Sequence, residues 1–545
     1  MKCLHLRSER VERSRGSERS RSRRHLLDLT TPDQRYTNHF IKNRSMQRLR
    51  TIIAVFFPLM LVAQDHDATF LGTGYLNLQV GQGNIGYGIH ATGTAIYLCG
   101  TSYDEQGDMQ LVVLARNTDG TALTSFGTNG QLVIEEPGST WSNALVESSP
   151  DGTIKLVTTR SGDEGQDVLV YSLTSSGTID ATFGSGGSSS IDLGGTDLLY
   201  DALVLADGRT AVLTFTPGIG AAVTLLATDG ATGSGYGDNG TAYLPNGVLA
   251  MSLAQASGGG LWVGGTQWTG SENDSWIGLL NGNGAFDSSF SGDGQTTIDL
   301  DPHLYEGTSD IITTLAPHPA GGHLALVNIY GDAIGYGLYR LARSNAQGQL
   351  IPGFGTAGVI DVLAPDFVNL LPSMILEPDG RSVLCVGADN ALVLEKRDSD
   401  GQLVDDWGSN GTSSISVPDR QQYSMSQTVE DPQGRIVAIG SARVDDEYTL
   451  AVDRVTNDLQ TAIEDQDGGI LGLMVFPVPF RTELSLRAKE PLRRVEVMDM
   501  GGRLVQSSTP NNALVHLDLR RMDAGIYMVH AHGDSGVTTR TVIKQ

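Results

Sequence analysis

A short phrase recurs along the chain and constrains the fold more than any other feature. Its clearest copy is Asp-Ala-Thr-Phe-Gly-Ser-Gly-Gly at Asp180–Gly187. Each copy has an aromatic residue, a glycine or a near substitute, two small or polar residues, and a closing glycine. The seven aromatic residues, here called the marker aromatics, lie 53 to 64 positions apart: Phe70, Phe126, Phe183, Tyr236, Phe290, Phe354 and Trp407. A period of this length indicates a repeat architecture.

Further glycine turns divide each repeat into short segments, as at Asp151-Gly152 and Asp229-Gly230. Asp-Gly and Asn-Gly pairs supply the positive φ that two-residue hairpin turns need. In the third repeat, the segments between turns predict strands at 189–193, 202–205, 210–215 and 222–227. Several of these segments are almost entirely apolar, as expected for strands covered on both faces.

Four antiparallel strands in each of seven repeats predict an all-β fold. We expect a seven-bladed β-propeller over residues 64–460 and a small C-terminal β-sandwich beyond it. Propellers have four to eight four-stranded blades, and closing the ring protects most sheet edges. A linear solenoid is the alternative, because nothing in the sequence proves that the ring closes. Whether one strand crosses over to latch the ring stays open.

The charge balance limits the classes of partner. The formal net charge is −25, and it becomes −34 once residues 1–63, with 14 Lys and Arg against 5 Asp and Glu, are set aside. An acidic surface repels phosphate backbones, so we expect no nucleic-acid partner. A soluble, well-solvated extracellular surface explains the acidity more simply than a specific cation-binding role.

The N-terminal region has the anatomy of an export signal. Residues 1–45 contain an Arg/Ser/Glu run without an apolar face, so we interpret them as a low-complexity leader before the true start at Met46. Arg48 and Arg50 then precede the apolar run 52–62, which ends at Ala63. This pattern predicts a secretory signal peptide over 46–63. The run is too short to span a bilayer, so the mature chain is expected to lack a transmembrane segment. A real cytoplasmic tail is the alternative.

The repeated phrase, with its Asp-Gly turns and spacing, resembles the delta-60 family of β-propeller repeats over residues 64–460. The resemblance is weaker where Gly replaces the leading aspartate, in the copies at Tyr236 and Phe354, and where Ser follows Phe290. The resemblance implies an extracellular or cell-surface protein and contributes no catalytic residues.

After a polar linker at 461–472, the segment 473–545 resembles the type A C-terminal sorting domain of the type IX secretion system. Its Leu484/Leu486 and Val495/Val497 alternation indicates half-buried strands of a small sandwich. Val478 is a departure, because the family usually has Asn there. The resemblance implies passage across both membranes, with this segment as the part that the secretion machinery binds, at the surface of a Gram-negative bacterium. The matching export-signal residues are Pro477, Pro479, Phe480, Asp499, Gly502, Arg503, Gly525, Tyr527 and Lys544.

Three groups of residues have side chains that could form a chemical site. His303, His318 and His323, near Asp301 and Glu306, could bind zinc, but a turn separates the last two histidines and a surface-loop interpretation is simpler. Asp398-Ser-Asp-Gly and Asp465-Gln-Asp-Gly resemble fragments of a calcium loop without its later ligands. Trp262, Trp268 and Trp276 could stack on sugar rings, although burial between blades explains them equally well.

We therefore predict no cofactor, no metal and no catalytic residue. Cys99 and Cys385 are expected to remain unpaired thiols, because they lie in repeats that are not neighbours in a ring of seven. The favoured function is a non-enzymatic, exported binding or scaffold protein with a possible glycan or protein ligand on one propeller face. The alternatives are an exported hydrolase of polysaccharide or peptide, and a purely structural envelope protein.

Overall fold

The computed structural model describes residues 66–544 apart from 163–164, 257, 301–307, 331–337, 363–371, 389, 419, 458–470, 472, 477–482, 500–502 and 523–524. The expected leader, the signal peptide and nearly all of the linker therefore lie outside the described residues. Every regular element that is described is a β-strand, so the all-β prediction is confirmed. Within the same residues, no helix is long and apolar enough to cross a membrane.

Between residues 75 and 455 the described strands form seven antiparallel sheets of four strands. Six of them, sheets 1 to 6, each contain four consecutive strands. Sheet 1 contains β2 (Gln82–Ala91), β3 (Ala95–Tyr103), β4 (Met109–Asn117) and β5 (Gln131–Ile134). Sheet 2 contains β6 (Thr140–Ser148), β7 (Ile154–Gly162), β8 (Gly165–Leu173) and β9 (Ser188–Ile191). Sheet 3 contains β10 (Leu198–Val204), β11 (Thr210–Thr216), β12 (Gly220–Leu226) and β13 (Thr241–Tyr243).

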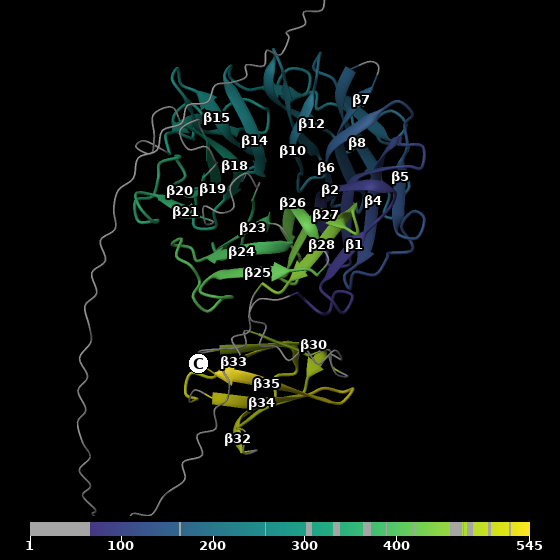
Figure 1. The fold of residues 1–545 in the computed structure, drawn as a ribbon. Helices are drawn as coiled ribbons and strands as arrows, with labels where there is room; N and C mark the ends of the chain where they lie inside the picture. The colour runs from purple at the N-terminus through teal and green to yellow at the C-terminus, as the bar shows by residue number, and fades with distance from the viewer. Residues whose placement is uncertain are drawn as a thin grey trace, which may run out of the picture. The chain divides into compact units, whose positions relative to one another are not determined.

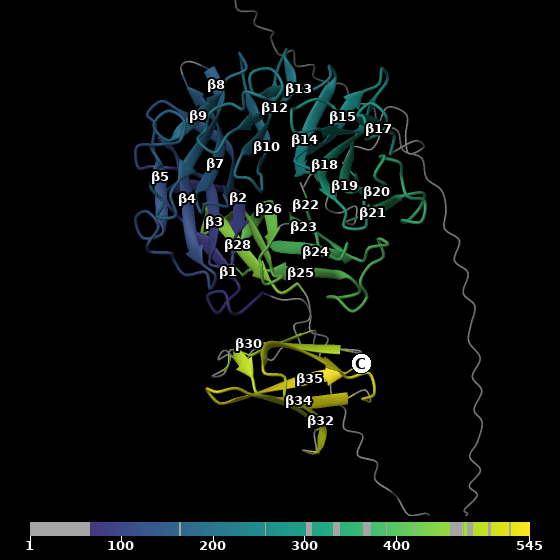
Figure 2. The same cartoon turned by 180° about the vertical axis from the view of Figure 1, so that it is seen from behind.

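Sheet 4 contains β14 (Val248–Gln255), β15 (Leu261–Trp268), β16 (Asn273–Leu280) and β17 (Gln295–Ile298). Sheet 5 contains β18 (Ser309–Pro317), β19 (His323–Tyr330), β20 (Leu338–Ser344) and β21 (Val359–Val362). Sheet 6 contains β22 (Ser373–Leu376), β23 (Ser382–Ala388), β24 (Ala391–Arg397) and β25 (Thr412–Ser416). Figure 1 shows the first strands β2, β10, β14 and β18 nearer a common centre than the last strands β5 and β21, and Figure 2 shows the same arrangement from behind.

Sheet 7 joins the two ends of the repeat region. It contains β26 (Gln421–Glu430), β27 (Ile436–Val444) and β28 (Glu447–Val455), and its fourth strand is β1 (Tyr75–Leu78). Leu76 lies directly opposite Val452 in this antiparallel pair. The strand after each marker aromatic thus completes the preceding sheet, and the first copy, which has no preceding sheet, completes the last one. The prediction that the third repeat forms one sheet is wrong for this reason: β9, after Phe183, belongs to sheet 2.

Neighbouring sheets enclose hydrophobic clusters, and the clusters follow a cyclic order. Sheets 1 to 7 contact one another in sequence, and β2 of sheet 1 contacts β26, β27 and β28 of sheet 7. Each of the seven clusters between adjacent sheets holds one marker aromatic. All seven of these side chains are buried, with at most 4% of any one exposed. The aromatic residue of the repeated phrase therefore packs between one sheet and the next.

Main-chain geometry explains the glycine after most marker aromatics. Gly127 and Gly184 have φ values of 52° and 54°, a conformation that glycine adopts without strain. A Cβ atom on Gly127 would lie 2.1 Å from the carbonyl oxygen of Gln131. The Gly127 N–H donates to the Ser176 carbonyl of the next sheet at 2.7 Å. In the first copy of the phrase, Leu71 takes the place of this glycine. It has a φ of 55°, and its N–H donates to the Asp119 carbonyl, so this copy keeps the same main-chain conformation without glycine.

The Asp-Gly turns differ from the expected two-residue type. In Asp151-Gly152 only the glycine has a positive φ, of 85°, whereas a type I′ turn needs positive φ at both residues. The Gly152 N–H donates to the Ser149 carbonyl at 2.9 Å, which fits a type I turn with glycine at its fourth position. The Asp151 carboxylate accepts the main-chain N–H and the hydroxyl of Thr153, which explains aspartate before the glycine.

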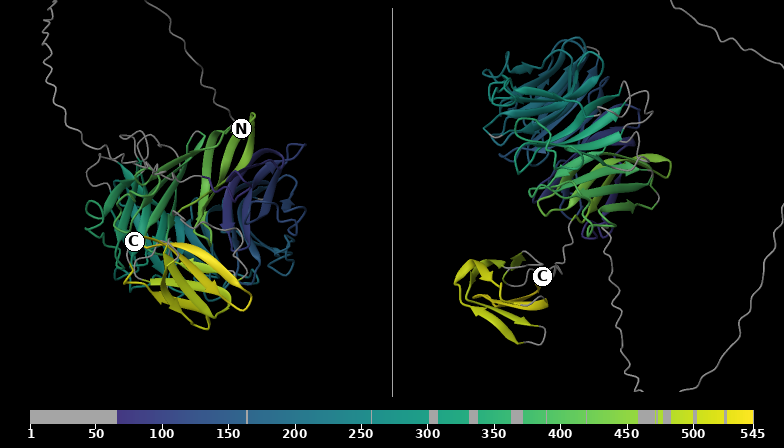
Figure 3. Two further views of the ribbon diagram at one scale, coloured as in Figure 1. Left: turned by 90° about the horizontal axis from the view of Figure 1, so that it is seen from below. Right: turned by 90° about the vertical axis from the view of Figure 1, so that its left-hand side faces the viewer.

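The C-terminal strands form two further antiparallel sheets, drawn in yellow in Figure 3. One contains β29 (Met474–Phe476), β30 (Glu483–Leu492) and β33 (Asn512–Asp518). The other has the order β32 (Leu504–Ser508), β31 (Arg494–Asp499), β34 (Gly525–His532) and β35 (Val537–Lys544). Leu484 and Leu486 share one buried cluster with Val495 and Val497, as their alternation predicts. Leu471 also belongs to this cluster, so the C-terminal unit begins within the expected linker.

Candidate functional sites

The seven sheets present two kinds of end. At one end lie the turns between first and second strands and the marker phrases. At the other end lie the hairpins between second and third strands and the connections to the next sheet; we call it the hairpin end. Two clusters of three aspartates occur there, between sheets 2 and 3 and between sheets 4 and 5: Asp167, Asp192 and Asp197; and Asp274, Asp299 and Asp310. In each cluster one carboxylate oxygen per residue lies within 4.8 Å of the others.

The two clusters occupy equivalent positions. Asp192 and Asp299 follow their marker aromatics by nine residues. Asp197 and Asp310 lie three residues before a β-bulge in the first strand of the next sheet, and both are fully buried. None of these six aspartates was predicted as a site residue from the sequence. The signal that could have found them is an aspartate at the ninth position after the marker in two repeats.

Main-chain and side-chain donors compensate much of the charge in both clusters. The Arg160 guanidinium lies 3.4 Å from the Asp167 carboxylate in the first cluster. In the second, the Ser275 and Leu300 N–H groups donate to the two oxygens of Asp310 at 2.6 and 3.1 Å. Burial, with the nearby Asp274, raises the pKa of Asp310 to about 6. Three such oxygens have the chemistry of ligands for a hard cation. Because nearby donors already balance much of the charge, the expectation that the chain binds no metal stays a prediction.

The histidines expected on a surface loop are buried, so that interpretation is wrong. His318 is 7% exposed and His323 is 1% exposed. The Arg343 guanidinium contacts His318 Nδ1 at 2.9 Å, and the His323 ring packs on Trp262 with centroids 4.1 Å apart. Burial, then Arg343, lowers the pKa of His323 to about 4. A ring nitrogen occupied by an arginine is poorly placed to bind zinc. His303, Asp301 and Glu306 lie outside the described residues.

The other candidate residues divide between core and surface. Trp276 is fully buried, Trp262 packs in the cluster between sheets 4 and 5, and only Trp268 is well exposed. The three tryptophans therefore form no common platform. Asp398 accepts the main-chain N–H groups of Asp400 and Gln402 in its hairpin turn, whereas Asp465 is outside the described residues. Cys99 and Cys385 are buried free thiols, as predicted.

Bulges in the first strands link these strands across the sheets. In three cases the residue just after the bulge accepts a main-chain N–H from the following sheet. The Ile89 N–H donates to Gln427 Oε1, the Leu253 N–H to Asp201 Oδ2, and the Leu315 N–H to Ser252 Oγ, at 2.7 to 3.0 Å. Such side chains satisfy groups that a bulge leaves unpaired in the ladder.

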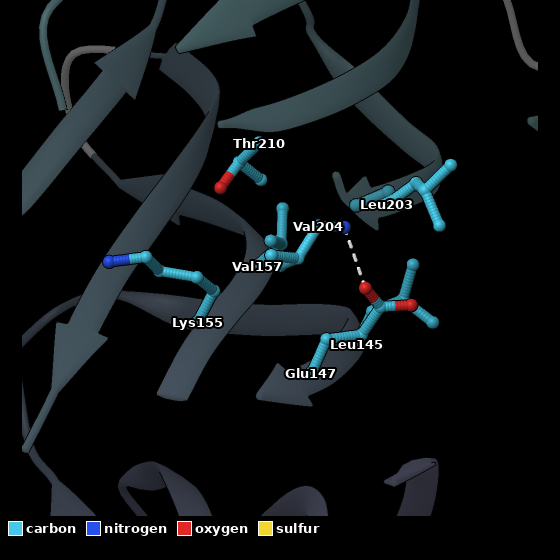
Figure 4. A pocket seen from close by; sticks show the side chains of 8 residues that line it. Leu145, Glu147, Lys155, Val157, Leu203, Val204 and Thr210 are labelled. Atoms are coloured by element: carbon cyan, nitrogen blue, oxygen red, sulfur yellow. Dashed lines mark hydrogen bonds between the residues drawn. The ribbon is translucent and has the colours of Figure 1, made fainter. Parts of the chain in front are cut away.

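Glu147 makes a similar bond beside a cavity of about 10 Å³, room for about one water molecule. Figure 4 shows the Val204 N–H donating to its carboxylate, at 2.6 Å. The Lys155 ammonium points away from Glu147 and donates to Ser172 Oγ. Burial, together with the nearby Asp201 carboxylate, raises the pKa of Glu147 to about 7. Burial also raises the pKa of Asp201 to about 7.

This burial predicts a pH-dependent stability. Since the folded protein holds a proton on Glu147 more tightly than the unfolded chain, with a pKa near 4.3, the free energy of unfolding should fall as pH rises from about 4.3 to about 7. Glu147→Gln should remove on the order of 3 kcal/mol of this dependence. Thermal melts between pH 4.5 and 8 measure it, with the exposed Glu105→Gln as the matched control. A variant with the pH profile of the unmodified protein would contradict the assignment.

The export-signal residues that are described converge at one end of a C-terminal sheet. Lys544 pairs with Gly525, and Tyr527 pairs with Asp499. Asp499 forms an ion pair with Arg503 at 2.9 Å across the hairpin between β31 and β32. Pro477, Pro479, Phe480 and Gly502 lie outside the described residues. Residues separated by about 45 positions are thus brought onto three adjoining strands.

A family model matches this region over residues 474–545, with the description "Secretion system C-terminal sorting domain". These residues are a secretion-system sorting domain. The sorting domain directs export through the type IX secretion system, to the cell surface or the extracellular space of Bacteroidetes-type bacteria. It also identifies the secretion machinery as a partner of the chain. A comparison with curated proteins found no match.

Solved structures similar to the chain include β-propellers. The propeller domain of the Trilobed protease from Pyrococcus furiosus is 11% identical, with a TM-score of 0.36, over 68% of this chain and 98% of that one. A protein of unknown function from Dyadobacter fermentans is 12% identical, with a TM-score of 0.38, over 59% and 96%. The polysaccharide lyase Uly1 is 9% identical, with a TM-score of 0.42, over 73% and 100%. Similarity at this level supports no inference about activity.

Proposed function

We propose that this chain is a non-enzymatic binding protein of the cell surface or the medium, built as a closed seven-bladed propeller of the delta-60 type. The cyclic order of the seven hydrophobic clusters, each with one marker aromatic, carries the proposal. The two C-terminal sheets around their common core form a β-sandwich in this account. A rigid ring offers loops at both ends for ligand contact, and the ligand is a glycan or a protein.

The domain order in this proposal follows the sequence. A signal peptide at 46–63, starting from Met46, takes the chain across the inner membrane. The propeller occupies 64–460, and the linker that begins at 461 leads to the sorting domain, whose core already includes Leu471. Against the hydrolase alternative, both oxygens of Asp310, the most buried acid of its cluster, already accept main-chain N–H groups. A general acid or base needs an oxygen that can reach the substrate.

Fractionation of the source bacterium tests the proposal. Antibodies to the repeats and to residues 473–545 are used on cytoplasm, periplasm, outer surface and medium. We expect the repeats at the surface or in the medium, without the terminal domain. A chain lacking residues 471–545 should stay in the periplasm. Full-length protein retained in the cytoplasm would contradict the proposal. Export of the truncated chain in the same amount as the complete chain would also contradict it.

A further inference from the structure

Two exposed aromatic side chains lie on adjacent sheets at the hairpin end. Trp268, at the end of β15, is 54% exposed, and Tyr330, at the end of β19, is 38% exposed. Single exposed aromatics are ordinary on protein surfaces. This pair differs because it belongs to one continuous polar and aromatic surface, which we call the Trp268–Tyr330 surface.

Strand pairings and one hydrogen bond connect the positions of the two rings. Trp268 lies opposite Asn273 in the pairing of β15 with β16, and Ser309 lies opposite Tyr330 in the pairing of β18 with β19. The Asn273 N–H donates to Ser309 Oγ at 3.1 Å, which joins the two sheets between the aromatics. Side chains directly opposite each other in antiparallel strands have Cβ atoms about 4.5–5.5 Å apart. The order across the surface is therefore Trp268, Asn273, Ser309, Tyr330.

The polar groups beside the rings define the chemistry of a ligand. The phenol of Tyr330 interacts with both Ser309 and Asn273, so the ring is held toward the junction between the sheets. One residue further along, Asp274 and Asp310 are held within the second aspartate cluster, and Asp299 is its exposed member. Sites of this kind combine apolar ring faces with a few polar groups that fix the orientation of a ligand.

We propose that the Trp268–Tyr330 surface binds an uncharged, hydroxyl-rich glycan. The C–H face of a sugar ring packs on each aromatic ring, while its hydroxyl groups bond with the Asn273 amide. Anionic polysaccharides are disfavoured, because the chain beyond residue 63 carries a formal net charge of −34 and Asp299 lies at the site. The same charge would attract a cationic peptide, so the test below includes one, although both oxygens of the buried Asp310 already accept main-chain N–H groups.

This inference rests on the proposed function, since it names the ligand of the exported binding protein. The exported protein is titrated by calorimetry with cellohexaose, xylohexaose and mannohexaose, with a hexaguluronate, and with hexalysine. We expect at least one neutral hexasaccharide to bind, and Trp268→Ala and Tyr330→Ala each to weaken it about tenfold or more. Trp268→Phe should restore most of the affinity, because it keeps an aromatic face.

Tyr243, 49% exposed on the edge strand β13, gives the matched control. Tyr243→Ala should leave the affinity unchanged, and melting curves should show each variant folded. The inference is overturned if no neutral hexasaccharide binds, if hexaguluronate or hexalysine binds more tightly, or if Tyr243→Ala costs as much as Trp268→Ala. Any of these results with the protein still at the cell surface leaves the proposed export standing. Retention in the cytoplasm instead contradicts the proposed function itself.

Discussion

Replacing Arg420 by alanine should lower the free energy of unfolding of the repeat region by about 3–5 kcal/mol. The Arg420 side chain is fully buried and contacts both oxygens of the buried Asp453, at 2.8 and 2.6 Å. It also donates to Asn77 Oδ1 at 2.7 Å and to the Leu76 carbonyl at 3.2 Å, so it ties β1 to β28. Among the described residues, His66 Nε2 would still lie 3.1 Å from an Asp453 oxygen, but the guanidinium that balances the buried charge would be gone.

Denaturant unfolding followed by tryptophan fluorescence measures this loss. All five tryptophans lie between Trp141 and Trp407, so the signal reports the repeat region and not the sorting domain. The matched control is Arg209→Ala, since Arg209 pairs with Asp207 at the surface, 31% and 54% exposed. Exposed pairs contribute about 0–1 kcal/mol. Equal losses for Arg420→Ala and Arg209→Ala would contradict the role of Arg420 in holding the ends of the chain together.

Much of the fold could be predicted because its determinants are local. The marker phrase needs only a buried aromatic, a residue with positive φ and a tight turn, and each requirement leaves a trace in the sequence. The seven marker aromatics all lie between sheets, so the period of the phrase reports the period of the fold. The same is true of Leu484, Leu486, Val495 and Val497, whose alternation marks strands with one buried face.

The pairing of the chain ends could not be predicted in this way. β1 is an ordinary short strand, and its partner β28 lies more than 370 residues away, so no local pattern distinguishes this partner from any other strand. The offset between sequence repeat and sheet has the same origin. This offset follows from the last sheet, which has only three consecutive strands and takes β1 as its fourth.

The candidate sites divide along similar lines. His318 and His323 flank a Pro-Ala-Gly-Gly turn, which predicts an exposed loop, but Arg343 of β20 and Trp262 of sheet 4 cover them. The clustering of Asp274 with Asp310 depends on the contact between sheets 4 and 5, which spacing alone does not reveal. The sorting-domain motifs were found directly, because their order along the chain is itself the signal.

A disulfide between β1 and β28 should stabilise the repeat region strongly. Leu76 and Val452 lie directly opposite each other, so cysteines at these positions would have Cβ atoms near the range that a disulfide needs. Cross-linking residues this far apart restricts the unfolded chain by as much as about 5 kcal/mol in the chain-entropy model. Comparing the oxidised and reduced forms of L76C/V452C isolates this effect from the cost of the two substitutions. Tryptophan fluorescence again reports the unfolding.

The native thiols should not interfere with this experiment. Cys99 and Cys385 are fully buried, and burial raises the pKa of each to about 12, so almost no thiolate forms near neutral pH. The single variants L76C and V452C serve as controls, because neither can form the designed cross-link. Each should melt at the same temperature with and without reductant.

The measurement that tests ring closure most directly is the disulfide state of monomeric L76C/V452C after mild oxidation, read by mass spectrometry of its peptides. Closure by β1 predicts one intramolecular bond between positions 76 and 452 and a higher melting temperature that reductant reverses. Free thiols at both positions, or bonds only between separate molecules, would contradict the closed ring and favour an open array of sheets.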